Sequence, residues 1–380
     1  MSKMTTLTKT AKLFSRIVKS VAPPPKITVS EWADMYRKLS PENSAEPGQW
    51  RTDRAPYQRE IMDAVTDPQV EKIVVMTSSQ VGKSEILNNI IGYYIDVDPA
   101  PILLVQPTIE ITQDYSKRRI TPMVKDTKVL SAKVADSKTR DLNNTILMKV
   151  FPGGFLAMGG ANSPAGLASR PIRILLCDEV DRYPSSAGGE GDPISLAEKR
   201  TITFWNRKKI FTSTPTIRGA SRIEAEYELG TREKYCVRCP KCGNYHLIVL
   251  RDIRFTHRCE EIAGKKTYIV EDIRWRCPDC GGEFDEYTMK RQPAEWIAEN
   301  PAAIVNGIRS FHLNSFVSPW HSWKEIIKEF LESKNDPERF KVFVNTILGE
   351  SWEERGDIED ETVLMSRREK YEAEVPDGVL

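Results

Sequence analysis

The sequence predicts an α/β protein with a mostly parallel central sheet flanked by helices and a small cysteine-rich module inserted in the chain. Three observations support this fold class. Strand-like runs alternate with helical patterns between residues 56 and 226, one of these runs passes through a short loop into a helical pattern, and six of the seven cysteines fall between Cys236 and Cys280. Such alternation is typical of parallel sheets, because parallel strands need a crossover connection that is usually a helix.

Length and composition set the limits of this prediction. The 380 residues allow two or three domains, and 55 basic against 54 acidic residues leave a net charge of +1. With 40% hydrophobic and 29% charged residues, the composition excludes a disordered tail and a small disulfide-stabilised protein. The longest apolar stretches, such as residues 172–177, are much shorter than the roughly 18 residues of a membrane helix, so we expect no membrane span.

Residues 1–55 are expected to form a basic arm and a helical lead-in. Six Lys or Arg residues and no acidic residue precede Glu31, and residues 23–25 are consecutive prolines. The arm is either a solvated tail without a partner or a segment that contacts nucleic acid or a neighbouring subunit. A helical pattern at 30–39 and a turn-rich stretch at 41–48 follow it.

Residues 56–230 are expected to form the core domain. Short runs rich in β-branched and aliphatic residues predict buried strands at 72–76, 102–106, 172–177 and 209–212. Two further runs, 146–150 and 155–158, flank Pro152-Gly153-Gly154 and predict a hairpin.

A phosphate-binding loop is predicted directly after the first of these strands. The loop reads Thr77-Ser78-Ser79-Gln80-Val81-Gly82-Lys83-Ser84, and a helical run at 85–94 follows. Strand, loop and helix in this order are the context of a Walker A motif, in which Lys83 reaches the β- and γ-phosphates of ATP and the Ser84 hydroxyl binds Mg²⁺. Thr77 replaces the first glycine of the motif, so a plain strand-to-helix loop with a surface lysine is the alternative. The residues expected to bind the nucleotide here are Ser79, Gln80, Val81, Gly82, Lys83 and Ser84.

A pair of carboxylates follows the strand at 172–177. Asp178 and Glu179 have the form of a Walker B strand end followed by a catalytic glutamate. Asp178 would hold Mg²⁺ through water, and Glu179 would activate the water that attacks the γ-phosphate. An acidic pair after a strand is a weak signal alone, but together with the loop at 77–84 it predicts a P-loop NTPase of the ASCE type.

Two other groups are candidates for nucleotide contact. Thr212, Ser213 and Thr214 close another strand and carry hydroxyls that can sense the γ-phosphate, and Tyr57 with Gln58 can stack on and hydrogen-bond adenine. For both groups a turn or packing role is the alternative.

An ATPase also needs a cation for the charge that develops in the transition state. Arg170 and Arg218 are the candidates, because Arg170 follows a Gly-Leu-Ala-Ser stretch and Arg218 follows the hydroxyl cluster. The alternative for each is an ordinary surface ion pair.

A zinc-binding module is predicted between residues 231 and 290. Two copies of Cys-Pro-x-Cys-Gly supply the expected zinc ligands Cys239, Cys242, Cys277 and Cys280. Cys236, Cys259, His246 and His257 lack the surrounding proline and glycine and are taken as non-ligands. Residues 231–258 contain seven Lys or Arg and two acidic residues, which suits either a solvated scaffold or contact with a phosphate backbone.

These motifs, in this order, resemble the large terminase subunit of tailed bacteriophages, with the lambda-type large subunits as the nearest branch. Further matching text lies at 30–34, 56–60, 180–183 and 345–350, so the resemblance covers roughly residues 29–380. It implies an ATP-driven motor that threads double-stranded DNA into a procapsid. The implied partners are double-stranded DNA, a small terminase subunit and the portal protein, with a homo-oligomeric ring as the assembled form in the host cytoplasm, transiently at the portal.

In that family a nuclease domain with clustered carboxylates follows the ATPase. This sequence ends at Leu380, about where that domain is expected to begin, and the acidic run at 353–361 reads as solvated charge in a linker. We therefore expect residues 291–380 to close the ATPase and to lack the nuclease domain and its cleavage activity.

Two other functions fit part of the sequence. A helicase-like remodelling ATPase would also use Gln58 and the hydroxyls of Thr212, Ser213 and Thr214. It needs a second recombinase-like domain, for which no room remains. A nucleic-acid-binding or assembly module with a silent ATPase would follow if Thr77 or missing neighbouring subunits prevent hydrolysis. Loss of hydrolysis in a Lys83→Ala variant separates a motor from a silent module.

Overall fold

The computed structural model describes residue 14 and residues 26–42, 44–134, 144–168, 170–262 and 265–354. Most of the predicted basic arm and of the acidic run at 353–361 therefore lies outside the described residues. The helices are α2 (Val29–Tyr36), α3 (Gln58–Asp63), α4 (Lys83–Asp96), α5 (Ile109–Tyr115), α6 (Thr121–Asp126), α7 (Lys128–Ser131), α8 (Pro164–Ala168), α9 (Pro193–Glu198), α10 (Arg222–Glu228), α11 (Glu286–Met289), α12 (Trp323–Ser333) and α13 (Pro337–Phe343). The strands are β1 (Lys38–Leu39), β2 (Gly48–Gln49), β3 (Lys72–Thr77), β4 (Pro101–Gln106), β5 (Met148–Phe151), β6 (Gly154–Gly160), β7 (Ile174–Asp178), β8 (Lys208–Ser213), β9 (Glu233–Arg238), β10 (Tyr245–His246), β11 (Ile253–Ile262), β12 (Lys265–Arg276), β13 (Glu283–Phe284), β14 (Ala294–Ala298) and β15 (Ile308–Leu313).

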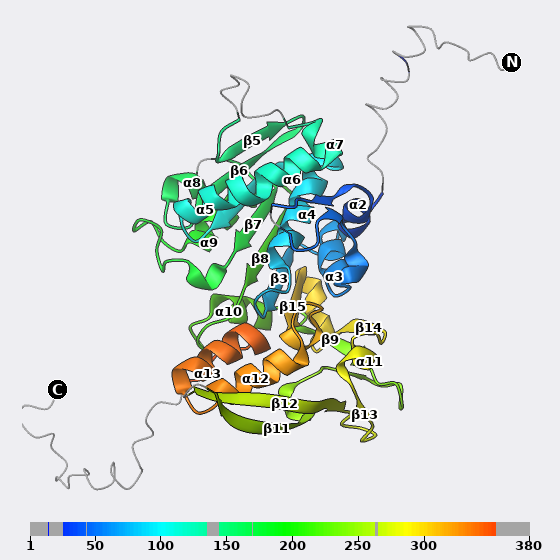
Figure 1. Ribbon diagram of the computed structural model, residues 1–380. Helices are drawn as coiled ribbons and strands as arrows, with labels where there is room; N and C mark the ends of the chain where they lie inside the picture. Colours follow the sequence, from blue (N-terminus) through cyan, green and yellow to red (C-terminus); the bar gives the residue numbers. More distant parts are fainter. Residues whose placement is uncertain are drawn as a thin grey trace, which may run out of the picture.

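A central sheet runs through the molecule in the order β10-β9-β15-β3-β8-β7-β4-β6-β5, with β14 paired to β9 (Figure 1). The pairs from β15 through β3, β8, β7 and β4 to β6 are all parallel. The predicted mostly parallel α/β sheet is thus confirmed, as is the hairpin of β5 and β6, which turns at Gly153 with φ +88°. Because the strands are parallel, the ends of β3, β7 and β8 lie at one edge of the sheet.

Apolar side chains cover both faces of this sheet. On one face α2, α3 and α4 pack with residues of β3 and β4, and on the other α8, α9 and α10 pack with β7 and β8. Trp32 of α2 is fully buried against Gly92 of α4, where a Cβ atom would lie 2.1 Å from the indole, and its Nε1 donates to Asp96 Oδ2 at 2.9 Å. The glycine in α4 is therefore required by the close approach of the tryptophan ring.

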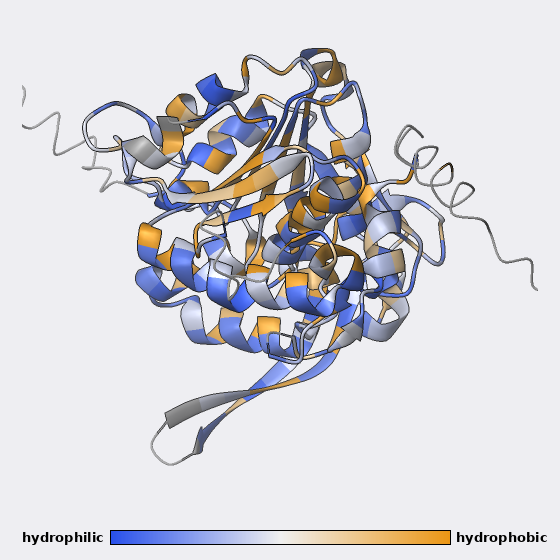
Figure 2. Cartoon of the chain, turned by 90° about the horizontal axis from the view of Figure 1, so that it is seen from above, coloured by the Kyte–Doolittle hydropathy of each residue, from blue (hydrophilic) through white to orange (hydrophobic). Residues whose placement is uncertain are grey.

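A further cluster of buried side chains joins the cysteine-rich segment to α12 and α13. Figure 1 shows these two helices beside β12. Trp275 of β12 and Trp323 of α12 are both fully buried in it. The hairpin of β11 and β12 projects from the body of the molecule (Figure 2). The same view shows the hydrophobic strands of the central sheet in the middle of the molecule. Among the described residues no helix combines the length and apolarity that a membrane crossing requires.

Candidate active site and metal centre

The loop between β3 and α4 has the geometry of an anion-binding turn. Gln80 and Gly82 have positive φ angles of 58° and 92°, and Gly82 is the N-cap of α4. Within the described part of the chain, the amide groups of residues 80–84 donate to no protein acceptor, whereas those of Ser78 and Ser79 donate to Leu313 O and Thr346 O, both at 2.8 Å. Five consecutive free amide groups at the start of a 14-residue helix form a site for a phosphate group.

Lys83 links this loop to the ends of two other strands. Its ammonium group donates to Thr214 Oγ1 at 2.6 Å after β8, and lies 3.6 Å from Glu179 Oε1 after β7. Only 9% of the Lys83 side chain is exposed. The lysine, the carboxylate and the hydroxyl that the sequence predicted for this site are therefore brought together.

Asp178 is buried at the end of β7 and is held by two neutral donors. Thr212 Oγ1 donates to its Oδ1 at 2.7 Å, and Gln106 Nε2 donates to its Oδ2 at 3.0 Å. Burial and the nearby Glu179 carboxylate raise the pKa of Asp178, and the two hydrogen bonds oppose this. A divalent cation next to Asp178 would stabilise its charged form, which fits the predicted Mg²⁺ site at Asp178 and Ser84.

Glu179 has a left-handed backbone conformation, with φ +53° and ψ +50°. Non-glycine residues rarely adopt it, and such strain is concentrated at functional sites. Its two carboxylate oxygens lie 3.6 Å from Lys83 Nζ and 3.7 Å from Arg182 Nε. Arg182 and Gln106 are site residues that the sequence analysis missed, although Gln106 ends a predicted strand at the same edge of the sheet.

Tyr57 and Gln58 lie beneath the loop. Both are buried, and Tyr57 Oη and Gln58 Nε2 donate to the carbonyl of Val81 at 3.2 and 2.9 Å. The Tyr57 ring packs edge-on against Tyr235, with 5.9 Å between ring centroids. In this conformation both side chains support the loop, and the Tyr57 ring has no open face for adenine.

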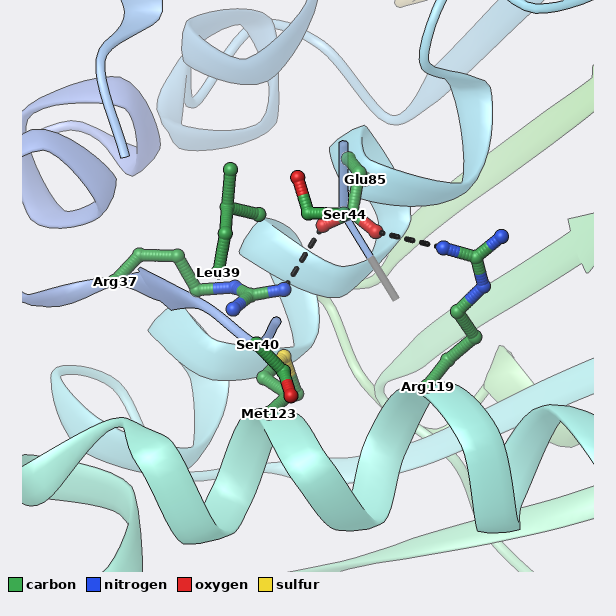
Figure 3. A pocket seen from close by; sticks show the side chains of 7 residues that line it. All are labelled: Arg37, Leu39, Ser40, Ser44, Glu85, Arg119 and Met123. Carbon is green, nitrogen blue, oxygen red and sulfur yellow. Dashed lines mark hydrogen bonds and ion pairs between the residues drawn. The ribbon is translucent and has the colours of Figure 1, made fainter. Parts of the chain in front are cut away.

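The first turn of α4 is fixed from the outside by two arginines. Glu85, the residue after Ser84, accepts a hydrogen bond from Arg37 at 2.9 Å and lies 3.6 Å from Arg119 (Figure 3). Tyr115 Oη also donates to the Ser84 carbonyl at 3.2 Å. These contacts set the direction of the helix end that faces the loop.

Three other residues predicted near the nucleotide, Ser213, Arg218 and Arg170, contact other parts of the protein. Ser213 Oγ donates to the Thr214 carbonyl and accepts the Asp181 amide, so it contacts the segment after β7. Arg218 is 60% exposed and lies 3.4 Å from Glu353. Arg170 is exposed and lies over the Phe155 ring of β6, with β8, β7 and β4 between it and β3. Neither arginine contacts Lys83 or Glu179 in this structure.

The four predicted zinc ligands come together in the cysteine-rich segment. The Sγ atoms of Cys239 and Cys280 are 3.8 Å apart, as are those of Cys242 and Cys277, and all four lie within 4.8 Å of one another. Four sulfur atoms around a tetrahedral Zn²⁺ at about 2.3 Å would be about 3.8 Å apart. Two of the six sulfur–sulfur distances have this value and the other four are at most 4.8 Å, so the cluster is compatible with a tetrahedral zinc ion.

The two cysteine turns share one backbone geometry. Gly243 and Gly281 have φ angles of 82° and 66°, and their amides donate to the carbonyls of Cys239 and Cys277, both at 3.0 Å. His246 Nε2 lies 3.6 Å from Cys277 Sγ and 3.3 Å from Asp279, so this predicted non-ligand borders the cluster. Among the described residues, Cys236, Cys259 and His257 belong to no group of potential metal ligands.

Comparison with models of known protein families shows to which family this chain belongs. The sequence model described as "Phage terminase large subunit gpA, ATPase domain" matches residues 44–296. The chain belongs to this family. The match includes the loop at 77–84, both carboxylates and all four zinc-ligand candidates.

A second match corrects one of our expectations. The model described as "Terminase large subunit gpA, endonuclease domain" matches residues 308–380, so the prediction that the chain lacks this part is wrong. The match begins at β15, which lies inside the central sheet and pairs with β3 along six residues. A boundary within a folded sheet carries no linker composition, and for this reason it was not visible in the sequence.

Two terminase relatives and one solved structure are similar over most of the chain. The large terminase subunit of Enterobacteria phage P21 is 27% identical over 94% of this chain, and that of Escherichia phage lambda is 28% identical over 95%. The chain spans 58% of the length of each relative. The crystal structure of the HK97 bacteriophage large terminase has a TM-score of 0.51 at 13% identity, covers 86% of this chain and 56% of its own, and supports the fold alone.

Proposed function

We propose that this chain hydrolyses ATP and forms the motor part of a terminase that moves double-stranded DNA into a procapsid. The observation that carries the proposal is the set of free amide groups at 80–84 next to Lys83, with Asp178 and Glu179 at the end of β7, which is separated from β3 by β8. Because the chain belongs to the terminase family, we propose that the energy of hydrolysis is used to package DNA. The proposed partners are a small terminase subunit, the portal and further copies of this chain in a ring.

The residues would divide the chemistry as follows. The amides of the loop and the Lys83 ammonium bind the β- and γ-phosphates, which draws Lys83 away from Glu179 and leaves that carboxylate free to accept a proton from the attacking water. Ser84 and Asp178 would hold Mg²⁺, which neutralises charge on the phosphates when bound. Thr214, which shares Lys83 with Glu179, is placed to report the presence of the γ-phosphate. Arg170 or Arg218 would act from a neighbouring copy in the ring.

ATP turnover with and without double-stranded DNA tests this proposal. We expect DNA to stimulate turnover, and we expect Glu179→Gln to lower it about 100-fold or more while ATP binding is retained, because only the proton acceptor is lost. Arg258→Gln, on the projecting hairpin far along the chain from the loop, is a charge-changing control with unchanged basal turnover. Full activity in Glu179→Gln would contradict the assignment.

The hydrogen bond from Thr212 to Asp178 leads to a prediction on metal affinity. Thr212→Val keeps the shape of this buried side chain but removes the donor to Asp178 Oδ1. We expect the Mg²⁺ concentration for half-maximal turnover to rise about tenfold, as is usual for groups that orient metal ligands. Thr201→Val removes a buried hydroxyl that donates to Glu198 O instead and should leave the Mg²⁺ requirement unchanged. Equal Mg²⁺ titrations for both variants would argue against Asp178 as a metal ligand.

We also propose a structural zinc ion at Cys239, Cys242, Cys277 and Cys280. The sulfur spacing supports it, and burial raises the pKa of the Cys277 thiol to about 12, so that a bound cation is needed to hold it as thiolate at pH 7. The domain organisation proposed for the chain is a lead-in at 1–55, an ATPase core at 56–230, a zinc module at 231–290 and a segment at 291–380. This last segment adds β15 to the central sheet and contains the residues 308–380 that match the endonuclease domain.

A further inference from the structure

The residues that follow α13 contact the phosphate loop directly. The π-helical turn Val344–Leu348 ends at Gly349, which has φ +67°. Thr346 O accepts both the amide of Ser79 at 2.8 Å and its hydroxyl at 3.1 Å. Ser79 is the last loop residue whose amide is taken by the protein, so Thr346 marks where the free amide groups begin.

Gly349 touches the backbone at the start of the same loop. A Cβ atom at this position would lie 2.6 Å from Ser78 N, 2.9 Å from Leu313 O and 3.0 Å from Thr77 C. His312 Nε2 also donates to Gly349 O at 3.1 Å. The Walker A motif has Thr77 in place of its first glycine, and here a glycine from a distant part of the chain provides the close backbone approach.

The same segment also holds the loop after β8. Trp352 N donates to Thr216 O at 2.8 Å, and Arg218 N donates to Trp352 O at 2.9 Å, which forms a short parallel bridge between Ile217 and Trp352. This loop begins at Thr214, the acceptor of Lys83. Residues 346–352 therefore contact both the phosphate loop and the loop that begins at Thr214. Lys83 connects these two loops through its hydrogen bond to Thr214.

We propose that residues 346–352 position the nucleotide site: Thr346 and Gly349 fix the start of the phosphate loop, and Trp352 fixes the coupling loop at 214–218. The proposal rests on the proposed ATPase function and deepens it. When ATP draws Lys83 from Thr214, we expect the contacts of Thr346 with the phosphate loop and those of Trp352 with the loop at 214–218 to change together. The segment lies within the region that matches the endonuclease domain, so nucleotide state is sensed in that part of the chain.

Hydrogen exchange of the wild-type chain, with and without Mg²⁺ and a non-hydrolysable ATP analogue, tests this. We expect slower exchange in peptides covering 80–84, 214–220 and 345–354, and no change in the Lys83→Ala variant. Slower exchange at 80–84 alone would overturn the positioning role while leaving the ATPase function intact. No change at 80–84 would contradict the proposed function and the inference with it.

A matched pair of glycine variants separates positioning from stability. Gly349→Ala and Gly307→Ala both place an alanine at a left-handed position, with φ +67° and +69°, but Gly307 lies before β15 against Gln69 and Glu71. We expect a larger loss of melting temperature in Gly349→Ala, because its Cβ would lie 2.6 Å from Ser78 N, whereas that of Gly307→Ala would lie 3.3 Å from Gln69 O. At a temperature where both variants are folded, we expect the KM for ATP to rise about tenfold in Gly349→Ala only, because a small displacement of binding groups has large kinetic effects. Equal KM values in the two variants would refute the role of Gly349.

Discussion

Lys83→Ala is expected to reduce ATP turnover at least about 100-fold, the usual loss when one group that stabilises transition-state charge is removed. The ammonium group is the one cation that the loop places beside both Thr214 and Glu179, at 2.6 and 3.6 Å. The Lys83 side chain is only 9% exposed. Its removal also leaves the Glu179 carboxylate with one cationic neighbour, Arg182, in place of two. Steady-state turnover measures the loss of catalysis. Binding of a fluorescent ATP analogue measures separately how far the affinity for the nucleotide changes.

Lys209→Ala is the matched control for this experiment. Lys209 is also largely buried, at 14% exposure, and it lies at the other end of the neighbouring strand β8, where it pairs with Glu71 at 2.9 Å. Both substitutions remove a largely buried lysine that pairs with a carboxylate, Lys83 at the start of α4 and Lys209 in β8, so their effects on folding should be similar. Loss of turnover in Lys209→Ala as well would mean that Lys83→Ala acts through stability, and the catalytic assignment would fail.

The central features of the active site could be predicted from sequence because each is local. The loop at 77–84 and the Asp178-Glu179 pair follow apolar strands, and parallel strands place their carboxyl ends at the same edge of the sheet. The position of β8 between β3 and β7 does not follow from these local patterns. The two cysteine turns are equally local, since each repeats Cys-Pro-x-Cys-Gly. In all three cases the residue types and the element that carries them are adjacent in the chain.

Features that depend on long-range packing were predicted less well. That β15 pairs with β3, more than 200 residues earlier in the chain, follows from no local pattern. Thr346 acts through its carbonyl, which leaves no residue-type signature, and Gly349 is one of 21 glycines in the sequence, so its residue type alone does not single it out. The text at 345–350 was noted only as a match to the family. The opposite case is Tyr57: its residue type suited adenine stacking, but its environment is the buried cluster with Tyr235 and Val81.

The second large effect is expected at the zinc centre. Cys277 is 1% exposed and lies two residues after the fully buried Trp275 of β12, in the cluster that also contains Trp323 of α12. Cys277→Ser should reduce zinc from about one ion per chain to a small fraction of it, because structural zinc sites use all four ligands. We expect the tryptophan fluorescence to shift to longer wavelength and the melting temperature to fall, since zinc binding contributes directly to folding free energy.

Cys259→Ser is the control, because Cys259 is exposed on β11 and belongs to no described ligand group. Removing zinc from the wild-type chain with a chelator should reproduce the Cys277→Ser phenotype, while Cys259→Ser keeps full zinc content and stability. The effect should extend to the nucleotide site: α12 packs on β12, and α13 leads directly into the segment that holds Ser79 through Thr346. A raised KM for ATP after chelation is therefore expected, and wild-type stability in Cys277→Ser would exclude a structural zinc ion.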